Sequence, residues 1–220
     1  MKRLSVIFVL SLSLLLLPSC KNAINLEMYL SEIRSSAYEC VSDDFSVTVY
    51  AEEKESPYLS DGFVAQMKKY VTVKIEDYKS SLSDASVTVK YGDVECFGKF
   101  EYSPLNGKFL TEIEVEKLPA VDELELTVVN AGEEKILTAK KVSKEGSISY
   151  KTALDKVAFA KSKEIEKMLS GDGSSIETRV RLITEGDSVY YFVSVTDSSG
   201  KIHAYLVDGQ TGEIVAEKEF

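Results

Sequence analysis

Apolar and polar residues alternate with a period of two through much of the first half of the chain. Phe45, Val47 and Val49, for example, are each separated by a polar residue. Successive side chains of a strand point to opposite faces, so this alternation predicts strands with one buried face. The pattern returns in five runs, at residues 71–75, 87–91, 100–102, 113–115 and 124–128. With turn-forming residues between them, these runs predict an antiparallel, immunoglobulin-like β-sandwich over residues 40–143.

Two other segments show the period of three to four residues that is typical of an amphipathic helix. Residues 26–38 predict a short helix that follows a tether beginning at residue 20. Residues 150–169 predict a longer helix, with Ser149 as its N-cap and Gly171 as its stop. Its solvent side carries charged residues, namely Lys156, Lys163, Glu164 and Lys167. Four alternating runs follow, at residues 178–184, 189–196, 201–207 and 213–217. One helix and an antiparallel meander predict a small α+β domain over residues 147–220.

The N-terminus has the features of an export signal. Lys2 and Arg3 precede an apolar run over residues 4–17, which is shorter than the roughly 20 residues that a membrane-spanning helix needs. The next residues, LPSC, resemble the lipobox of bacterial lipoproteins, although proline is unusual at the position two before the cysteine. The resemblance implies that residues 1–19 are a signal peptide and that Cys20 is lipidated. The protein would then be anchored at the outer face of the cytoplasmic membrane or in the cell envelope. An ordinary signal peptide, or an uncleaved anchor, with an incidental cysteine is the alternative.

Charge narrows the possible partners. The formal net charge is −10, and loss of Lys2 and Arg3 with the signal peptide would make it about −12. Nucleic-acid binding depends on clustered lysine and arginine, and the chain has no basic run. We therefore expect no nucleic-acid partner.

Three cysteines are present, and lipidation of Cys20 would leave two. Cys40 and Cys96 either form a disulfide, which export permits, or remain thiols. In the chain-entropy model, a disulfide closing a loop of this length contributes about 4 kcal/mol of stability. Neither cysteine lies in a recognisable disulfide motif, so both possibilities stay open.

The C-terminal segments ISYKTALDKVA and YYFVSVTDSSGKIHAYLVDGQTGEIV, in that order, resemble the PepSY family, a small extracytoplasmic module. Tyr205, Asp208, Thr211 and Gly212 stand where the closing element of the family places its residues. The stretch 171–175 is richer in glycine and serine than the compact link common in the family. PepSY modules occur in propeptides of secreted peptidases, so the resemblance implies a peptidase or a peptide as the ligand.

The chain offers little for metal binding or catalysis. His203 is the only histidine, and it shares a face of its predicted strand with Tyr205 and Val207. A zinc site needs three or four ligands, so we expect this ring to pack at the sheet edge or face solvent. The motifs HExxH, GxSxG and CxxC and a phosphate-binding glycine loop do not occur. We therefore expect no metal and no catalytic residue.

The acidic residues around the last hairpin have three possible roles. Asp208 and Glu213 could form a carboxylate pair for glycoside hydrolysis, or Asp208 and Asp197 could bind calcium. Turn formation is the simpler interpretation, with Asp208 accepting backbone hydrogen bonds and with Gly209 and Gly212 at positive φ.

The sequence therefore predicts a non-enzymatic, lipid-anchored binding or regulatory module without a cofactor. An extended peptide could pair with an open edge of the C-terminal sheet. A structural component of an envelope or surface assembly is the alternative.

Overall fold

The computed structural model describes residues 24–58, 65–77, 82–104, 107–142, 146–170, 176–186 and 188–220. The predicted signal peptide and Cys20 lie outside these residues, as does Gly171. The helical elements are a 3-10 helix η1 (Leu26–Tyr29), α2 (Tyr150–Ala160) and α3 (Ser162–Leu169).

Within the described residues, thirteen strands form one hydrogen-bonded sheet. They are β1 (Leu30–Val41), β2 (Phe45–Glu55), β3 (Met67–Asp77), β4 (Ser86–Tyr91), β5 (Val94–Lys99), β6 (Glu101–Ser103), β7 (Lys108–Val115), β8 (Glu123–Asn130), β9 (Glu133–Lys141), β10 (Glu177–Glu185), β11 (Ser188–Thr196), β12 (Ile202–Asp208) and β13 (Ile214–Glu219). The main path runs β13-β12-β11-β10-β1-β2-β3-β7-β6, and a branch β9-β8-β4-β5 leaves from β1.

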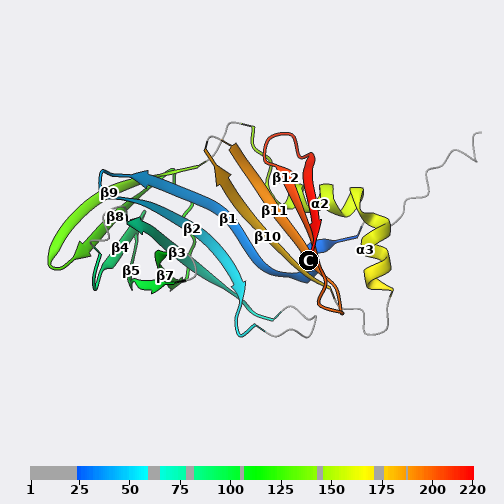
Figure 1. Ribbon diagram of the computed structural model, residues 1–220, viewed down its shortest axis with the longest axis horizontal. Helices are drawn as coiled ribbons and strands as arrows, with labels where there is room; N and C mark the ends of the chain where they lie inside the picture. The colour runs from blue at the N-terminus through cyan, green and yellow to red at the C-terminus, as the bar shows by residue number, and fades with distance from the viewer. Residues whose placement is uncertain are drawn as a thin grey trace, which may run out of the picture.

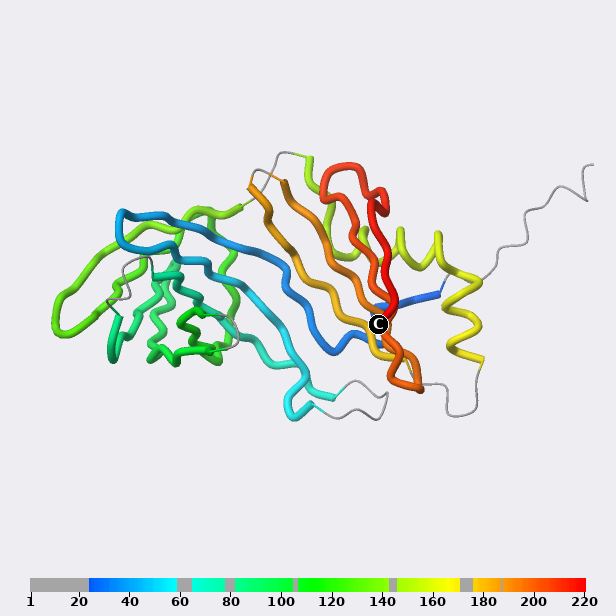
Figure 2. Tube along the Cα trace, viewed as in Figure 1, coloured from blue at the N-terminus to red at the C-terminus, as the bar shows by residue number. Residues whose placement is uncertain are grey.

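The long strands β1 and β2 extend through both parts of the molecule (Figures 1 and 2). β1 pairs with β2 along most of its length. On its other side, β1 pairs first with β10 and then, at Tyr38 and Glu39, with β9. The β1–β10 pairing is parallel, which the expected all-antiparallel arrangement did not include. The two expected domains thus have separate cores but share one sheet.

In the N-terminal part, the sheet curls around a single core. The alternating residues of the predicted strands line this core, and Val47, Val49, Val71 and Val73 are at most 1% exposed. The branch strands face β2, β3 and β7, and β5 lies beside β7, which nearly closes the curl. The prediction of a mostly antiparallel β fold is confirmed. These strands connect into one curled, nearly closed sheet.

The predicted helix over residues 26–38 is wrong beyond its first turn. Only Leu26–Tyr29 is helical, and β1 begins at Leu30. The register of β1 shifts between Leu30 and Glu32 and again between Arg34 and Ser36. Each bulge adds a residue to one strand and changes which side chains face the core. Two bulges in a strand therefore produced apolar spacings of three and four residues that imitate a helix.

The C-terminal part matches its prediction closely. Ser149 caps α2 by accepting a hydrogen bond from the Thr152 backbone N–H at 3.1 Å. The predicted helix is divided at Lys161 into α2 and α3. Both helices pack on one face of the β10–β13 meander, where Leu154, Val157 and Ile165 are at most 1% exposed. Among the described residues, no helix is long and apolar enough to span a bilayer.

Candidate functional site

The outer face of β2 and β3, which points away from the N-terminal core, is polar and aromatic. Along β2, Ser46, Thr48 and Tyr50 alternate with buried valines. Register places them beside Glu76, Lys74 and Thr72 of β3. This alternation follows from the strand period, because one face must be apolar to pack and the other is free to carry polar groups.

Glu52 anchors a network of charges on this face. Its side chain is 1% exposed and accepts hydrogen bonds from Arg34 Nε at 2.6 Å and Thr72 Oγ1 at 2.7 Å. Lys54 Nζ lies 3.1 Å from its second oxygen. Burial raises the pKa of Glu52, but the charges of Arg34 and Lys54 and the bond from Thr72 outweigh burial and lower it. The carboxylate is therefore ionised, and both of its oxygens are bound by groups of the protein itself.

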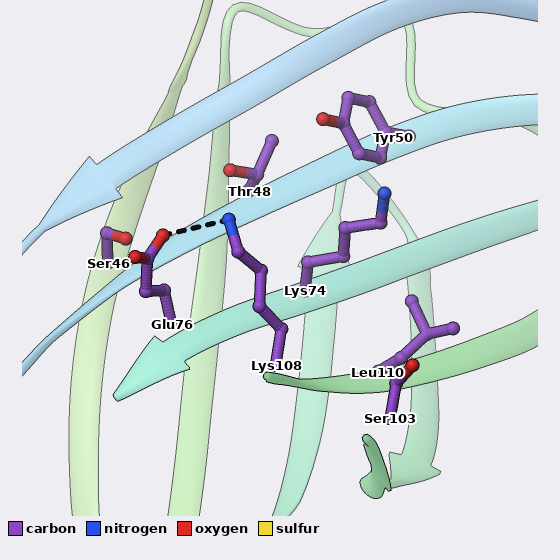
Figure 3. A pocket seen from close by; sticks show the side chains of 8 residues that line it. All are labelled: Ser46, Thr48, Tyr50, Lys74, Glu76, Ser103, Lys108 and Leu110. Atoms are coloured by element: carbon purple, nitrogen blue, oxygen red, sulfur yellow. Dashed lines mark ion pairs between the residues drawn. The ribbon is translucent and has the colours of Figure 1, made fainter. Parts of the chain in front are cut away.

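Next to this network, a pocket of about 330 Å³ lies on the outer face (Figure 3). Its lining combines hydroxyl groups with two lysines and one carboxylate, contributed by Ser46, Thr48, Tyr50, Lys74, Glu76, Ser103, Lys108 and Leu110. Lys108 Nζ pairs with Glu76 Oε2 at 2.8 Å, so these two charges compensate each other.

Lys74 is the uncompensated cation of this pocket. No carboxylate of the described residues lies within ion-pair distance of it, and its Nζ instead lies 4.9 Å from the centre of the Tyr50 ring. Arg34 approaches the same ring at 3.9 Å. Burial lowers the pKa of Lys74, and repulsion from Arg34, Lys108 and Arg181 adds to this effect, although the charge of Glu52 partly opposes it. A lysine surrounded by cations and hydroxyl groups favours an anionic ligand, which would offset the repulsion and accept their hydrogen bonds.

The predicted turn residues occupy the positions expected of them. Asp208 Oδ1 accepts hydrogen bonds from the backbone N–H groups of Gln210 at 2.9 Å and Thr211 at 2.8 Å. Gly212 has a φ of +73°. Tyr205 is buried in the core below the helices. These residues are structural, and Asp208 and Asp197 flank opposite ends of β12, so they do not form the calcium site considered above.

The role predicted for Gly209 is wrong, because its φ is not in the positive region. Close packing requires glycine here instead. A Cβ at this position would lie 2.6 Å from the Val189 carbonyl oxygen, which accepts a hydrogen bond from the Gly209 N–H at 2.8 Å.

Cys40 and Cys96 are both free thiols and both half-buried against the N-terminal core. Burial raises the pKa of Cys40 and raises that of Cys96 to about 11. The structure therefore contains no disulfide between them.

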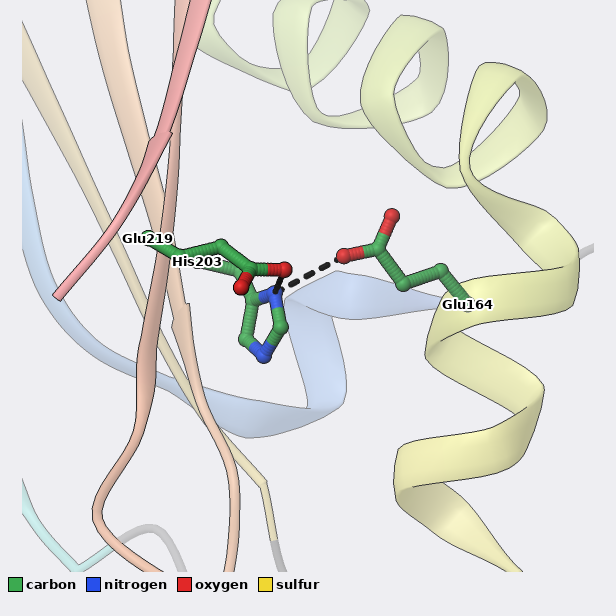
Figure 4. A group of neighbouring side chains, drawn as sticks. All are labelled: Glu164, His203 and Glu219. Atoms are coloured by element: carbon green, nitrogen blue, oxygen red, sulfur yellow. Dashed lines mark ion pairs between the residues drawn. The ribbon is translucent and has the colours of Figure 1, made fainter.

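Three features of the C-terminal part were not predicted from the sequence. His203 is buried, and Glu164, which was expected on the solvent side of the helix, points toward it from α3 (Figure 4). The predicted last strand ended before Glu219, which the register of β12 and β13 places opposite His203. Extending the predicted last strand by two residues and pairing it antiparallel with the preceding strand would have placed Glu219 beside His203, because directly opposite residues of paired strands share a face.

The edge expected to accept a peptide is β13, which ends the main path of the sheet. Most of β13 is exposed, and it carries Glu217, Lys218 and Glu219. Charged residues on an edge strand oppose pairing with another strand. The pocket at Lys74 is therefore the better candidate for ligand binding.

Comparisons with known proteins add no assignment. No protein-family model matches the chain, and no curated protein matches it. A similar solved structure is the YpmB protein from Bacillus subtilis, at 19% identity and a TM-score of 0.24, covering 63% of this chain and 87% of that one. A TM-score this low supports no conclusion about fold or function.

Proposed function

We propose that this protein is a lipid-anchored, extracytoplasmic binding module without enzymatic activity, and that it binds an anionic group of a peptide or peptidase in the pocket at Lys74. The observation that carries the proposal is the position of Lys74, half-buried at a pocket wall with no carboxylate of the described residues within ion-pair distance. The hydroxyl groups of Ser46, Thr48 and Ser103 provide further donors around it.

Two further elements of the proposal come from the sequence. Residues 147–220 would form a PepSY-like module, in keeping with one helical layer on an antiparallel meander. Residues 40–143 would form a sandwich-like unit whose second layer is the curled branch β9-β8-β4-β5. The PepSY resemblance favours a peptide ligand, and a peptide offers carboxylates at acidic side chains and at its C-terminus.

Peptide binding tests the pocket directly. Full-length protein in detergent would be titrated into fluorescent pools of random octapeptides, one pool with free C-terminal carboxylates and one amidated. We expect tighter binding of the free-carboxylate pool, and about tenfold weaker binding after Lys74→Ala, as for loss of one hydrogen bond to a charged group. Lys90→Ala, which removes an exposed lysine of β4, is the matched control. Equal binding by wild type and Lys74→Ala would refute the proposal.

Anchoring needs a separate experiment, because Cys20 lies outside the described residues. Cells expressing the wild type, Cys20→Ala or Cys40→Ala would be labelled with radioactive palmitate and fractionated. We expect label and membrane retention for the wild type and Cys40→Ala, and no label on Cys20→Ala. An unlabelled wild type would show that the protein is not a lipoprotein.

A further inference from the structure

Three potential metal ligands meet between the helices and the edge of the C-terminal sheet. They are Glu164 from α3, His203 from β12 and Glu219 from β13 (Figure 4). His203 Nδ1 lies 2.8 Å from Glu164 Oε1 and 3.3 Å from Glu219 Oε1. One ligand atom from each residue falls within 4.8 Å of the other two.

The histidine is buried without a hydrogen bond at the nitrogen that faces this cluster. Its side chain is only 8% exposed, and Nδ1 makes no hydrogen bond with either carboxylate despite the short distances. A buried polar atom without a hydrogen bond is costly. Short contacts without hydrogen-bond alignment are what ligand atoms make when they surround a common centre. Zinc bonds of about 2.0–2.1 Å place neighbouring tetrahedral ligand atoms about 3.3 Å apart. The separation of His203 Nδ1 from Glu219 Oε1 is 3.3 Å, and that from Glu164 Oε1 is shorter, at 2.8 Å.

We propose that Glu164, His203 and Glu219 form a binding site for a divalent transition-metal ion, with Zn²⁺ as the preferred ion. Imidazole and carboxylate ligands suit this ion, and three protein ligands leave a fourth coordination position. All three residues line a pocket of about 260 Å³.

Asp197 lies near the second ring nitrogen of His203, at a distance beyond that of a hydrogen bond. Metal-bound histidines usually direct their second nitrogen to a carboxylate or carbonyl group. His203 Nε2 faces Asp197 Oδ2 at 3.9 Å. The other oxygen of Asp197 is held by Ser199 N at 2.8 Å, Ser199 Oγ at 2.6 Å and Lys201 N at 3.1 Å. The turn therefore fixes this carboxylate with one oxygen directed toward the ring.

The two carboxylate ligands are also oriented by neighbours. Tyr205 Oη donates to Glu164 Oε1 at 3.2 Å, and Lys201 Nζ lies 2.5 Å from Glu219 Oε2, whereas Glu219 Oε1 is the oxygen 3.3 Å from His203 Nδ1. Two more cations line the pocket. Lys161 is paired with Glu217, and Lys218 lies over the Phe220 ring at 4.5 Å. Of the two oxygens nearest His203 Nδ1, Glu164 Oε1 accepts the Tyr205 hydrogen bond and has a second lone pair, which it could offer, with Glu219 Oε1, to a cation between them.

A metal at this place would connect α3 to the edge strand. Glu219 lies at the end of β13, and the single described neighbour of this strand in the sheet is β12. Coordination would therefore hold the last strand against the helix layer, and ion binding would raise the stability of the folded protein by mass action.

The test uses tag-free, full-length protein, because an affinity tag would add histidines. The protein would be treated with chelator, dialysed against ZnCl₂ and then against buffer, and analysed for bound metal and thermal stability. We expect one equivalent of zinc and a raised Tm. With Co²⁺ as the probe, we expect the visible absorption bands of a tetrahedral site. Since His203 is the only histidine, its ¹⁵N signals report binding without assignment, and Nδ1 should shift on zinc addition.

Variants separate a metal site from adventitious binding. His203→Ala, Glu164→Gln and Glu219→Gln should each lose the zinc and the Tm increase, with unchanged circular dichroism confirming that at least one of them is folded. Asp197→Asn should bind roughly 10–100-fold more weakly. Glu166→Gln, an exposed residue of the same helix, is the matched control and should bind like the wild type. The proposal is wrong if the wild type retains no zinc, or if the ligand variants retain as much as Glu166→Gln.

Discussion

Among single residues, Glu52 makes the clearest case for a large energetic effect. We expect Glu52→Ala to lower the free energy of unfolding by about 3–5 kcal/mol, because Arg34 would lose its buried partner. Glu112→Ala removes a carboxylate that is 45% exposed and is bound to the same Lys54, and it should cost less than about 1 kcal/mol. Urea denaturation followed by circular dichroism gives both values. Similar losses for the two variants would show that burial of Glu52 does not matter.

The same carboxylate predicts a dependence on pH. Burial alone would raise the pKa of Glu52, but Arg34, Lys54 and Thr72 lower it in the folded protein. A group whose pKa is lower in the folded state stabilises the fold above its unfolded pKa and loses that contribution as pH falls through the folded pKa. Below about pH 4.3, wild-type stability should therefore fall more steeply than that of Glu52→Gln. Parallel curves for the two proteins would contradict this assignment.

The thiols give a third prediction at this scale. Burial raises the pKa of Cys96 to about 11, and only the thiolate reacts with alkylating reagents. At pH 8, native Cys96 should react roughly 100-fold more slowly than a free cysteine, and unfolding in urea should remove the difference. Peptide mass spectrometry after timed alkylation measures the rate. Native protein that stays unmodified even in urea would instead contain the Cys40–Cys96 disulfide.

Local chemistry explains which residue roles were accessible from sequence. The roles of Ser149 and Asp208 depend on backbone atoms two or three residues away, and both were predicted correctly. Glu164, His203 and Glu219 meet only because a helix break and a strand register bring them together. A need for glycine at position 209 was predicted correctly, but for the wrong reason. The need comes from close packing against Val189, which lies on another strand and could not be foreseen from local sequence.

Among the elements, α2 depends measurably on its cap. We expect Ser149→Ala to lower the free energy of unfolding by about 1 kcal/mol, because the Thr152 N–H loses its acceptor. Ser149→Asp should keep most of the stability, since its carboxylate accepts the same bond and interacts favourably with the helix dipole. Thermal unfolding of the three proteins provides the comparison. If Ser149→Asp is as unstable as Ser149→Ala, the hydroxyl has another role.

Element prediction worked where burial is one-sided and regular, and β1 shows why it failed elsewhere. β2, β3 and β8 have an apolar face, and apolar and polar residues alternate in them over residues 45–51, 71–75 and 124–128. In β1, two bulges and burial against two different cores remove the alternation. β9 was missed for the opposite reason, because among its nine residues only Ala139 is buried. β1, which pairs with three other strands, was therefore harder to recognise from its sequence pattern than strands such as β2 that pack one face against a single core.

For the whole molecule, the shared strand β1 predicts that the two cores unfold together. Loss of the N-terminal part would take β2 and β9 from β1, and β1 is in turn the parallel neighbour of β10. Leu126, fully buried in the N-terminal core, and Leu154, buried in the other, are suitable probes. Leu126→Ala and Leu154→Ala should each cost about 2–5 kcal/mol.

Hydrogen exchange shows whether that cost reaches the other core. We expect Leu126→Ala to lower the opening free energy of amides in β11 as much as in β4, and Leu154→Ala to do the same in reverse, because one cooperative unit has one global unfolding free energy. If β11 keeps its full protection in Leu126→Ala, the C-terminal part is stable with β1 alone. In that case the sheet would be continuous in structure, but its two parts would unfold with separate free energies. The boundary between them would fall within β1, between its pairings with β10 and β9.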